Sequence, residues 1–177
     1  MEIVEGIGKA IGKRFTTEKE KDPTTFAPVD VLDYIYAVLH TPQYRAQYKE
    51  FLKIDFPRVP YPKDATEWDF KVEKGKILRG LHLLESEEVE EYITSFPESG
   101  DNLVGKPKWE NNKVWLNVTQ YFEGVTEEVW HFYIGGYQPA QKWLKDRVGR
   151  KLTFEEVLHY QKMVCALAGT VRVMEEL

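Results

Sequence analysis

The segment from Ile134 to Lys151 carries the side chains best suited to chemistry, and that chemistry is nucleic-acid binding. Polar, basic and aromatic residues gather there on an expected short helix and its exit: Tyr137, Gln138, Gln141, Lys142, Trp143, Lys145, Arg147, Arg150 and Lys151. Glutamine can pair bidentately with adenine and arginine with guanine, whereas lysine holds phosphates. Composition alone still favours a solvated basic helix anchored by Trp143 and Leu144, because short basic helices are common.

A second candidate surface lies around an expected β-hairpin. Its polar residues cluster about the hairpin tip: Lys106, Lys108, Asn111, Asn112 and Lys113. Asn117, Thr119 and Gln120 follow in the chain. A β-ribbon can enter the major groove of DNA. Asparagine also occurs in such turns simply because it tolerates their dihedral angles, so this cluster taken alone is more simply a turn.

Patterns for catalysis or metal binding are weak. The four histidines form no His-x-x-x-His pair, and the single cysteine, Cys165, has no base at helical spacing. The glycines near the N-terminus lack the spacing of a phosphate-binding loop. One loose arrangement of carboxylates and lysines, Asp69, Glu73, Lys74 and Lys76, leaves a small Mg-dependent nuclease as a less favoured alternative.

Charge and composition limit the class of protein. The chain has 177 residues and a net charge of -5, which is unusual for a nucleic-acid binder. The charge is uneven, because Gln138–Lys151 holds five basic residues and only Asp146 as an acid. An acidic run, Glu85–Glu91, stands apart from it and would also suit a protein–protein docking module. No apolar run is long enough to span a bilayer, and we expect a cytoplasmic protein without a membrane partner.

The elements that must position these residues follow the order helices, strands, helices, which predicts an α+β fold. We expect residues 1–25 to form a linker or junction and residues 26–177 to form the domain. A helical hairpin starts at Pro28 and again at Pro42, running through Leu52, and a further helix covers about Ala65–Leu84. A small antiparallel β region spans Tyr92–Phe122. Short helices capped by Thr126 and started by Pro139 then precede a long amphipathic helix opened by Thr153.

Two long segments resemble a known family. PVDVLDYIYAVLHTPQYRAQYKEFLKIDFPRVPYPKD (Pro28–Asp64) and VWLNVTQYFEGVTEEVWHFYIGGYQPAQKWLKDRVGR (Val114–Arg150) are similar to the C-terminal specificity domain of type ISP restriction–modification enzymes. Such enzymes are single polypeptides of the LlaB type and contain an adenine-specific DNA methyltransferase. Ile77–Ser86 and Leu152–Leu167 match the same family in collinear order.

The resemblance implies a DNA target-recognition domain that is not catalytic by itself. Its implied partners are double-stranded DNA and a methyltransferase domain of the same or a partner polypeptide. No cofactor is expected in this domain, since S-adenosylmethionine, Mg and ATP belong to other domains of the family's enzymes. The resemblance assigns Tyr137–Arg150 to backbone contacts or scaffold, and base choice to the less family-like stretch from about Gly100 to Lys113. Docking without DNA reading stays the alternative.

Overall fold

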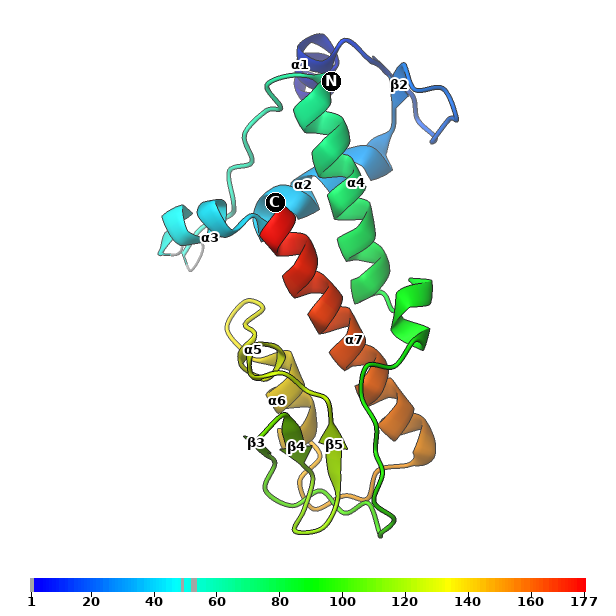
Figure 1. Cartoon of the computed structure of the whole chain (residues 1–177). Helices are drawn as coiled ribbons and strands as arrows, with labels where there is room; N and C mark the ends of the chain where they lie inside the picture. Colours follow the sequence, from blue (N-terminus) through cyan, green and yellow to red (C-terminus); the bar gives the residue numbers. More distant parts are fainter. Residues whose placement is uncertain (1, 49, 52–53) are drawn as a thin grey trace. The chain divides into compact units, whose positions relative to one another are not determined.

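The computed structural model describes residues 2–48, 50–51 and 54–177, and it has the predicted α+β architecture (Figure 1). Its helices are α1 (Glu2–Ile11), α2 (Pro28–His40), α3 (Pro42–Tyr48), α4 (Ala65–His82), the 3-10 helix η2 (Glu87–Glu90), α5 (Glu127–His131), α6 (Pro139–Lys145) and α7 (Phe154–Glu176). Its strands are β1 (Arg14–Phe15), β2 (Thr25–Phe26), β3 (Lys108–Glu110), β4 (Lys113–Trp115) and β5 (Tyr121–Glu123). The end of the second predicted helix, at Leu52, lies outside the described residues.

The chain divides into two compact units. Unit 1 comprises Met1–Gly80 and Arg172–Leu177, and unit 2 comprises Leu81–Val171. Two of the predicted helices, α4 and α7, therefore each contribute residues to both units. Each unit has a hydrophobic core of its own, as expected of a compact folding unit.

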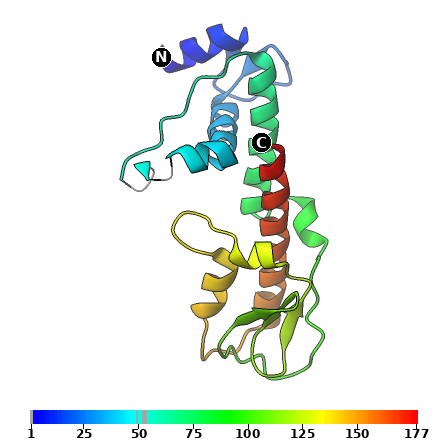
Figure 2. The same cartoon turned by 60° about the vertical axis from the view of Figure 1, so that its left-hand side comes forward.

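The core of unit 1 is built around Trp68 of α4. The indole stacks on Tyr34 at a ring-centroid distance of 5.0 Å and meets Phe26 edge to face at 5.4 Å. Both geometries are favourable for aromatic pairs. Burial and the neighbouring Glu67 raise the pKa of Tyr34 to about 12, so its phenol stays protonated at neutral pH and donates to the carbonyl of Pro60. Figure 2 shows α2 beside α4 in this unit.

The expected linker at residues 1–25 contains regular structure. Ile7 and Ile11 of α1 are each 5% exposed in the core of unit 1, and β1 pairs in parallel with β2. Residues 17–24 are exposed, as predicted for a loop. Helix α1 was not predicted because each of its glycines lowers helix stability by about 1 kcal/mol relative to alanine. Burial of the apolar residues Val4, Ile7 and Ile11 outweighs that cost. The domain boundary expected at residue 26 stays a prediction.

Helices α2 and α4 cross at Gly75, where no side chain fits. A Cβ atom on Gly75 would lie 1.7 Å from the carbonyl oxygen of Asp33. One turn along α4, Arg79 donates from Nε and Nη2 to the two carboxylate oxygens of Asp33 at 2.6 and 3.1 Å. The Asp33 side chain is 3% exposed, and a bidentate arginine is the partner that such a buried carboxylate requires.

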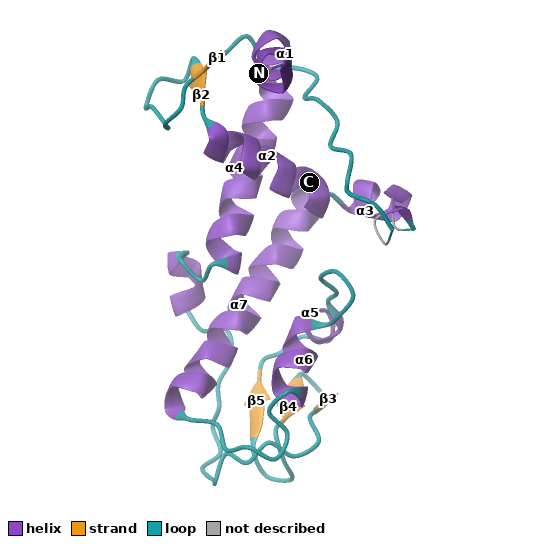
Figure 3. Cartoon of the chain, turned by 180° about the vertical axis from the view of Figure 1, so that it is seen from behind, coloured by secondary structure: helices purple, strands orange, loops and turns teal. Residues whose placement is uncertain are grey.

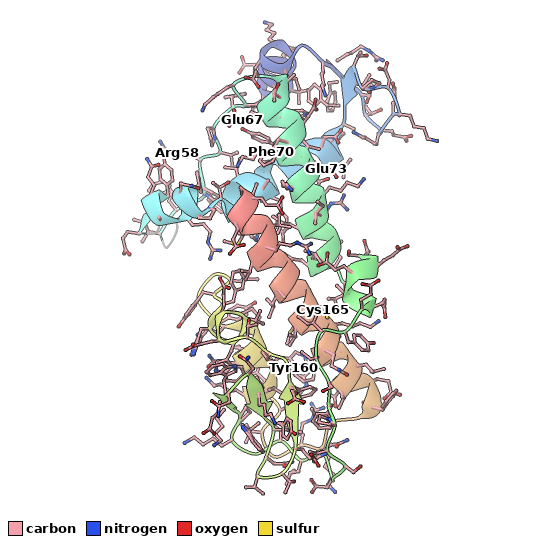
Figure 4. The ribbon with its side chains drawn as sticks, viewed as in Figure 1. Arg58, Glu67, Phe70, Glu73, Tyr160 and Cys165 are labelled. Atoms are coloured by element: carbon pink, nitrogen blue, oxygen red, sulfur yellow. The ribbon has the colours of Figure 1, made fainter. Side chains whose placement is uncertain are left out.

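Unit 2 packs a three-stranded antiparallel sheet against α6 and α7 (Figure 3). Strand β4 lies in the middle, pairing with β3 and β5. Val114 and Phe122 point into the core, and Tyr160 of α7, labelled in Figure 4, packs on the Phe122 ring at 4.5 Å. The inner face of the sheet is therefore closed by helices, whereas its outer face carries polar and aromatic residues.

The β region that was expected over Tyr92–Phe122 is only partly strand. Within Tyr92–Phe96, only Ser95 forms a bridge, to Glu123, and Leu103 forms a single bridge to Lys151. Strand β3 starts only after Pro107, which has no N–H to donate to a ladder. The predicted hairpin turn is confirmed, because Asn111 and Asn112 both take left-handed dihedrals, with φ of 54° and 58°.

The predicted helix starts of unit 2 are confirmed. The Thr126 hydroxyl accepts from the Val129 amide at the start of α5. Thr153 and Glu156 form the predicted capping box, each accepting from the other's backbone amide at 3.1–3.2 Å. Helix α5 ends at His131, and Ile134 pairs with Tyr137 across the turn at Gly135 and Gly136.

Candidate nucleic-acid interface

The structure separates the candidate hairpin residues into two places. Lys108 pairs with Trp115 across the strands, and Glu110 pairs with Lys113. The Asn111–Asn112 turn and the turn at residues 116–120 therefore lie at opposite ends of the short sheet. Lys106 and Lys108 lie at the end of the sheet that carries the 116–120 turn. This corrects the expectation that they surround the Asn–Asn tip.

Backbone segments that carry four basic residues come together at that end of unit 2. We call this set the basic end: Lys106, Lys108, Arg150 and Lys151. Backbone hydrogen bonds join the segments, from the Val104 amide to the Arg150 carbonyl and from the Gly105 amide to the Leu116 carbonyl, both 2.8 Å. The Leu103–Lys151 bridge adds to them. Residues nearly 50 positions apart in the sequence are thus fixed beside one another.

Two lysines of the basic end have free ammonium groups. Lys108 pairs with Glu110 at 2.9 Å and Arg150 with Glu156 at 2.7 Å. Lys106 and Lys151 are exposed and have no ion pair with any residue that the structure describes. A free, exposed lysine on a rigid backbone can bind a phosphate without first breaking an internal ion pair.

A second group of candidate residues lines a hollow beside α6. Its volume is about 280 Å³. The lining includes five of the predicted residues: Tyr137, Gln138, Gln141, Lys142 and Lys145. The Tyr137 ring is 52% exposed at the rim. The candidate residues from Tyr137 to Lys145 therefore lie together at this hollow, whereas Arg147 does not line it.

Both glutamines of the hollow hydrogen-bond to the C-terminal end of α5. Gln141 is 8% exposed, and its Nε2 donates to the carbonyl of Trp130 at 3.1 Å. Its Oε1 accepts from Lys145 Nζ at 2.9 Å. Gln138 Nε2 donates to the carbonyl of His131 at 3.2 Å. These amides hold the C-terminal end of α5. Tyr137 and the ammonium groups of Lys142 and Lys145 are left as the contact groups of the hollow.

Arg147 is held inside unit 2. Its guanidinium lies 3.6 Å from the centroid of the Trp143 ring, and Nη1 donates to the Trp143 carbonyl at 2.9 Å. Its Nε donates to Glu156 at 3.3 Å. Backbone hydrogen bonding by Thr153, followed by the charges of Arg150 and Arg147, lowers the pKa of Glu156. Arg147 thus joins the end of α6 to the start of α7.

The Asn–Asn tip has exposed side chains on a fixed backbone. The Asn112 carbonyl accepts from the amides of Gly124 and Val125 at 2.9 and 3.1 Å. Lys113 is engaged, with its Nζ 4.1 Å from the Tyr121 ring centroid and 3.3 Å from Glu123. Hydrogen bonding to Tyr121 and to Glu123 raises the pKa of Lys113. Asn111 and Asn112 are therefore available for contact, whereas Lys113 supports the sheet.

Sequence reasoning missed a second hollow at the basic end. It has a volume of about 440 Å³ and is lined by Gly105, Lys106, Lys108, Trp115, Asn117 and Val118. Val118 is 94% exposed. The sequence feature that could have indicated this hollow is the tetrapeptide Asn117–Gln120, in which one apolar residue lies within a polar turn.

The nuclease alternative gains no metal site from the structure. Asp69 pairs with Lys13, and Lys74 pairs with Glu176, while Glu73 is exposed on α4 (Figure 4). No group of three or more His, Cys, Asp or Glu residues suited to a metal ion occurs in the described part of the chain. Across the same residues, no helix is long and apolar enough to cross a membrane.

Comparisons with known proteins identify the family and support the fold. The family model "Type ISP C-terminal specificity domain" matches residues 3–176. No curated protein matches the chain. A solved structure of the ATP-dependent Type ISP restriction–modification enzyme LlaBIII bound to DNA is similar, with a TM-score of 0.65 and 17% identity over 86% of this chain.

Two further solved structures share the fold over 86% of this chain. The DrdV–DNA complex matches with a TM-score of 0.68 and 18% identity. A nuclease-deletion mutant of the Type ISP enzyme LlaGI, in complex with a DNA substrate mimic, matches with a TM-score of 0.62 and 20% identity. The chain spans only 11% of the LlaBIII chain, 18% of DrdV and 14% of LlaGI.

Proposed function

Because the chain belongs to the family of Type ISP C-terminal specificity domains, we propose that it reads a target sequence in double-stranded DNA for a restriction–modification enzyme. The family match over residues 3–176 is the observation that carries this function. The DNA complexes of LlaBIII and DrdV support DNA as the ligand. By itself the domain catalyses no reaction in this proposal, and S-adenosylmethionine, Mg and ATP act in other domains of the enzyme.

Phosphate binding belongs to the exposed lysines. Lys106 and Lys151 contact the backbone at the basic end, and Lys142 and Lys145 do so beside the α6 hollow. Lys142 must exchange its ion pair with Asp146, 2.6 Å away, for a phosphate. Lys106 and Lys151 make no such exchange, so they contribute most to affinity. Each neutralised phosphate releases counterions, which makes the binding salt-dependent.

Base reading belongs to exposed polar groups on fixed backbone. Asn111 and Asn112 are exposed at a rigid turn, and asparagine can pair bidentately with the adenine edge in the major groove. One such contact discriminates against a wrong base by about 1–3 kcal/mol. Gln138 and Gln141 act instead as positioning residues, because their amides already bond the C-terminal end of α5.

The uneven charge of unit 2 supports a single DNA-facing side. Residues 81–101 contain seven acidic and no basic residues, whereas residues 102–151 contain eight basic and five acidic ones. A negative net charge therefore coexists with a locally basic region. The acidic segment repels DNA, which favours approach through the hairpin and α6.

Docking to a methyltransferase is the second part of the proposal and is assigned to unit 1. An apolar hollow of about 250 Å³ there is lined by α1, α2 and the proline-rich segment at residues 57–62. Ile3 and Tyr61 at this hollow are 64% and 55% exposed. An Ile3→Glu change should abolish co-elution with the methyltransferase region of a type ISP enzyme. An unchanged co-elution would remove docking from unit 1.

Enrichment from a randomised duplex library tests the DNA-reading function. Wild type should enrich one asymmetric motif at low salt, and the double variant Lys106→Glu, Lys151→Glu should lose retention of all duplexes. Lys76→Glu, at an exposed lysine of unit 1, is the matched control and should enrich the same motif. Retention without any motif would reduce the proposal to non-specific DNA binding, and no salt-dependent retention would leave docking as the function.

A further inference from the structure

The turn at residues 116–120 presents an apolar side chain on an unusually well-fixed backbone. Val118 at its apex is 94% exposed, the highest fraction among the large hydrophobic residues that the structure describes. Single exposed apolar residues are common and need no explanation on their own. The surroundings of Val118 are what make it informative, because the polar neighbours of the turn hydrogen-bond to one another and to the adjoining loop.

Asn117 uses its side chain to close the turn. Its Oδ1 accepts from the Thr119 amide, the Thr119 hydroxyl and the Gln120 amide at 2.8–3.1 Å. Its Nδ2 donates to the carbonyl of Leu103 at 3.0 Å and to Gln120 Oε1 at 3.1 Å. The amide group of Asn117, next to the apex, is therefore used within the turn.

Gln120 anchors the same turn from within unit 2. It is 1% exposed, and its Nε2 donates to the Glu98 carbonyl and to Asn102 Oδ1 at 3.1 and 2.8 Å. Its Oε1 accepts from the Asn102 amide at 2.9 Å. Because the buried amide has its partners satisfied, the position of Val118 is set before any ligand arrives. Valine itself has a stiff χ1, so the apex loses little entropy on contact.

The apex stands beside the basic end. The hollow next to Val118 has Trp115 in its lining, and Lys106 and Lys108 line it as well. This arrangement combines an apolar apex with cations that suit a phosphate backbone. Asp101, an acidic residue of the adjoining loop, accepts from the amide of Leu103 at 3.1 Å.

We propose that Val118 reads thymine, by contact of its methyl groups with the C5-methyl group of one thymine in the major groove. The inference rests on the proposed DNA-reading function and names one specificity-determining residue for it. The C5-methyl is the only apolar group that base pairs present in the major groove, and an apolar side chain recognises it. Insertion between base steps does not fit, because such wedges are longer or flatter side chains such as Phe, Leu, Ile, Met or Pro.

The test uses the full chain and duplexes of its enriched motif in which each thymine is replaced in turn by deoxyuridine. One replacement should weaken wild-type binding about fourfold, the effect of burying one methyl group. Val118→Ala should bind the thymine duplex about as weakly as wild type binds the uracil duplex, with no further loss on uracil. Val118→Thr, which keeps the shape and one methyl, should retain part of the discrimination.

Val148→Ala is the matched control, because Val148 is also exposed, at 56%, and lies just after α6. It should keep the full response to uracil, and thermal unfolding should show that all variants are folded. A motif in which no uracil replacement matters, or in which Val118→Ala responds as wild type does, overturns the inference and leaves DNA reading intact. The absence of any enriched motif instead rejects the proposed function.

Discussion

Lys106 and Lys151 can be changed to test DNA binding without loss of an interaction that stabilises the fold. Both are exposed, and neither has an ion-pair partner among the described residues. Lys106→Ala and Lys151→Ala should each weaken binding to all sequences alike and reduce the slope of log affinity against log salt by about 0.9. Fluorescence anisotropy at several salt concentrations measures this slope. A change in the preferred motif, rather than in the slope, would contradict the assignment to phosphates.

The charge of Glu156 should make the stability of the fold pH-dependent. Its pKa is lowered in the folded state, first by the Thr153 amide and then by the neighbouring arginines, so its contribution is present above the unfolded pKa. That contribution is lost as the pH falls through the folded pKa. Glu156→Gln should cost less than about 1 kcal/mol at neutral pH, since the group is partly exposed. Urea unfolding at several pH values should show that wild type loses more stability below pH 4 than the variant does.

The sequence predicted which residues lie together, but not the role that each of them has in our proposal. Tyr137, Gln138, Gln141, Lys142 and Lys145 do line one hollow. Sequence could not tell that Gln141 is buried or that Arg147 stacks on Trp143, because both depend on the packing of α6 against α5 and α7. Their assignment as DNA contacts is therefore replaced in our proposal by a positioning role.

Helix starts were predictable at the scale of elements, because caps and prolines act locally. The starts at Pro28, Pro139 and Thr153 are examples. Helix α1 was not predicted, since its glycines lower helix propensity. Its apolar face is stabilised by packing in the same core as Phe26 and Trp68. Bridges such as Leu103–Lys151 join distant segments and leave no local pattern in the sequence.

The crossing of α2 and α4 depends on the absence of a side chain at Gly75. Gly75→Ala would place a methyl group 1.7 Å from the Asp33 carbonyl oxygen, so the helices must separate and the Asp33–Arg79 pair must loosen. We expect a loss of about 3 kcal/mol or more in the free energy of unfolding. Urea unfolding followed by circular dichroism measures it. Lys76→Ala, at the next, exposed position, should change stability by no more than about 0.5 kcal/mol.

At the scale of the whole molecule, collinear motifs predicted the family and the order of elements predicted the α+β class. The division into two units was not predicted. It falls at Gly80, inside α4, and sequence patterns mark boundaries by loops rather than by positions within a continuous helix. The two proposed tasks are assigned to different units: docking to the apolar hollow of unit 1, and DNA reading to the exposed asparagines and lysines of unit 2.

The ratio of two dissociation constants tests the central claim most directly. One is measured for the enriched duplex and the other for a duplex of equal length and composition with the motif scrambled, both across a salt series. DNA reading predicts that both affinities fall with salt along similar slopes, because phosphate contacts are shared, while the ratio stays at about 100 or more. Equal affinities for the two duplexes at every salt concentration would contradict a sequence-reading role for this domain.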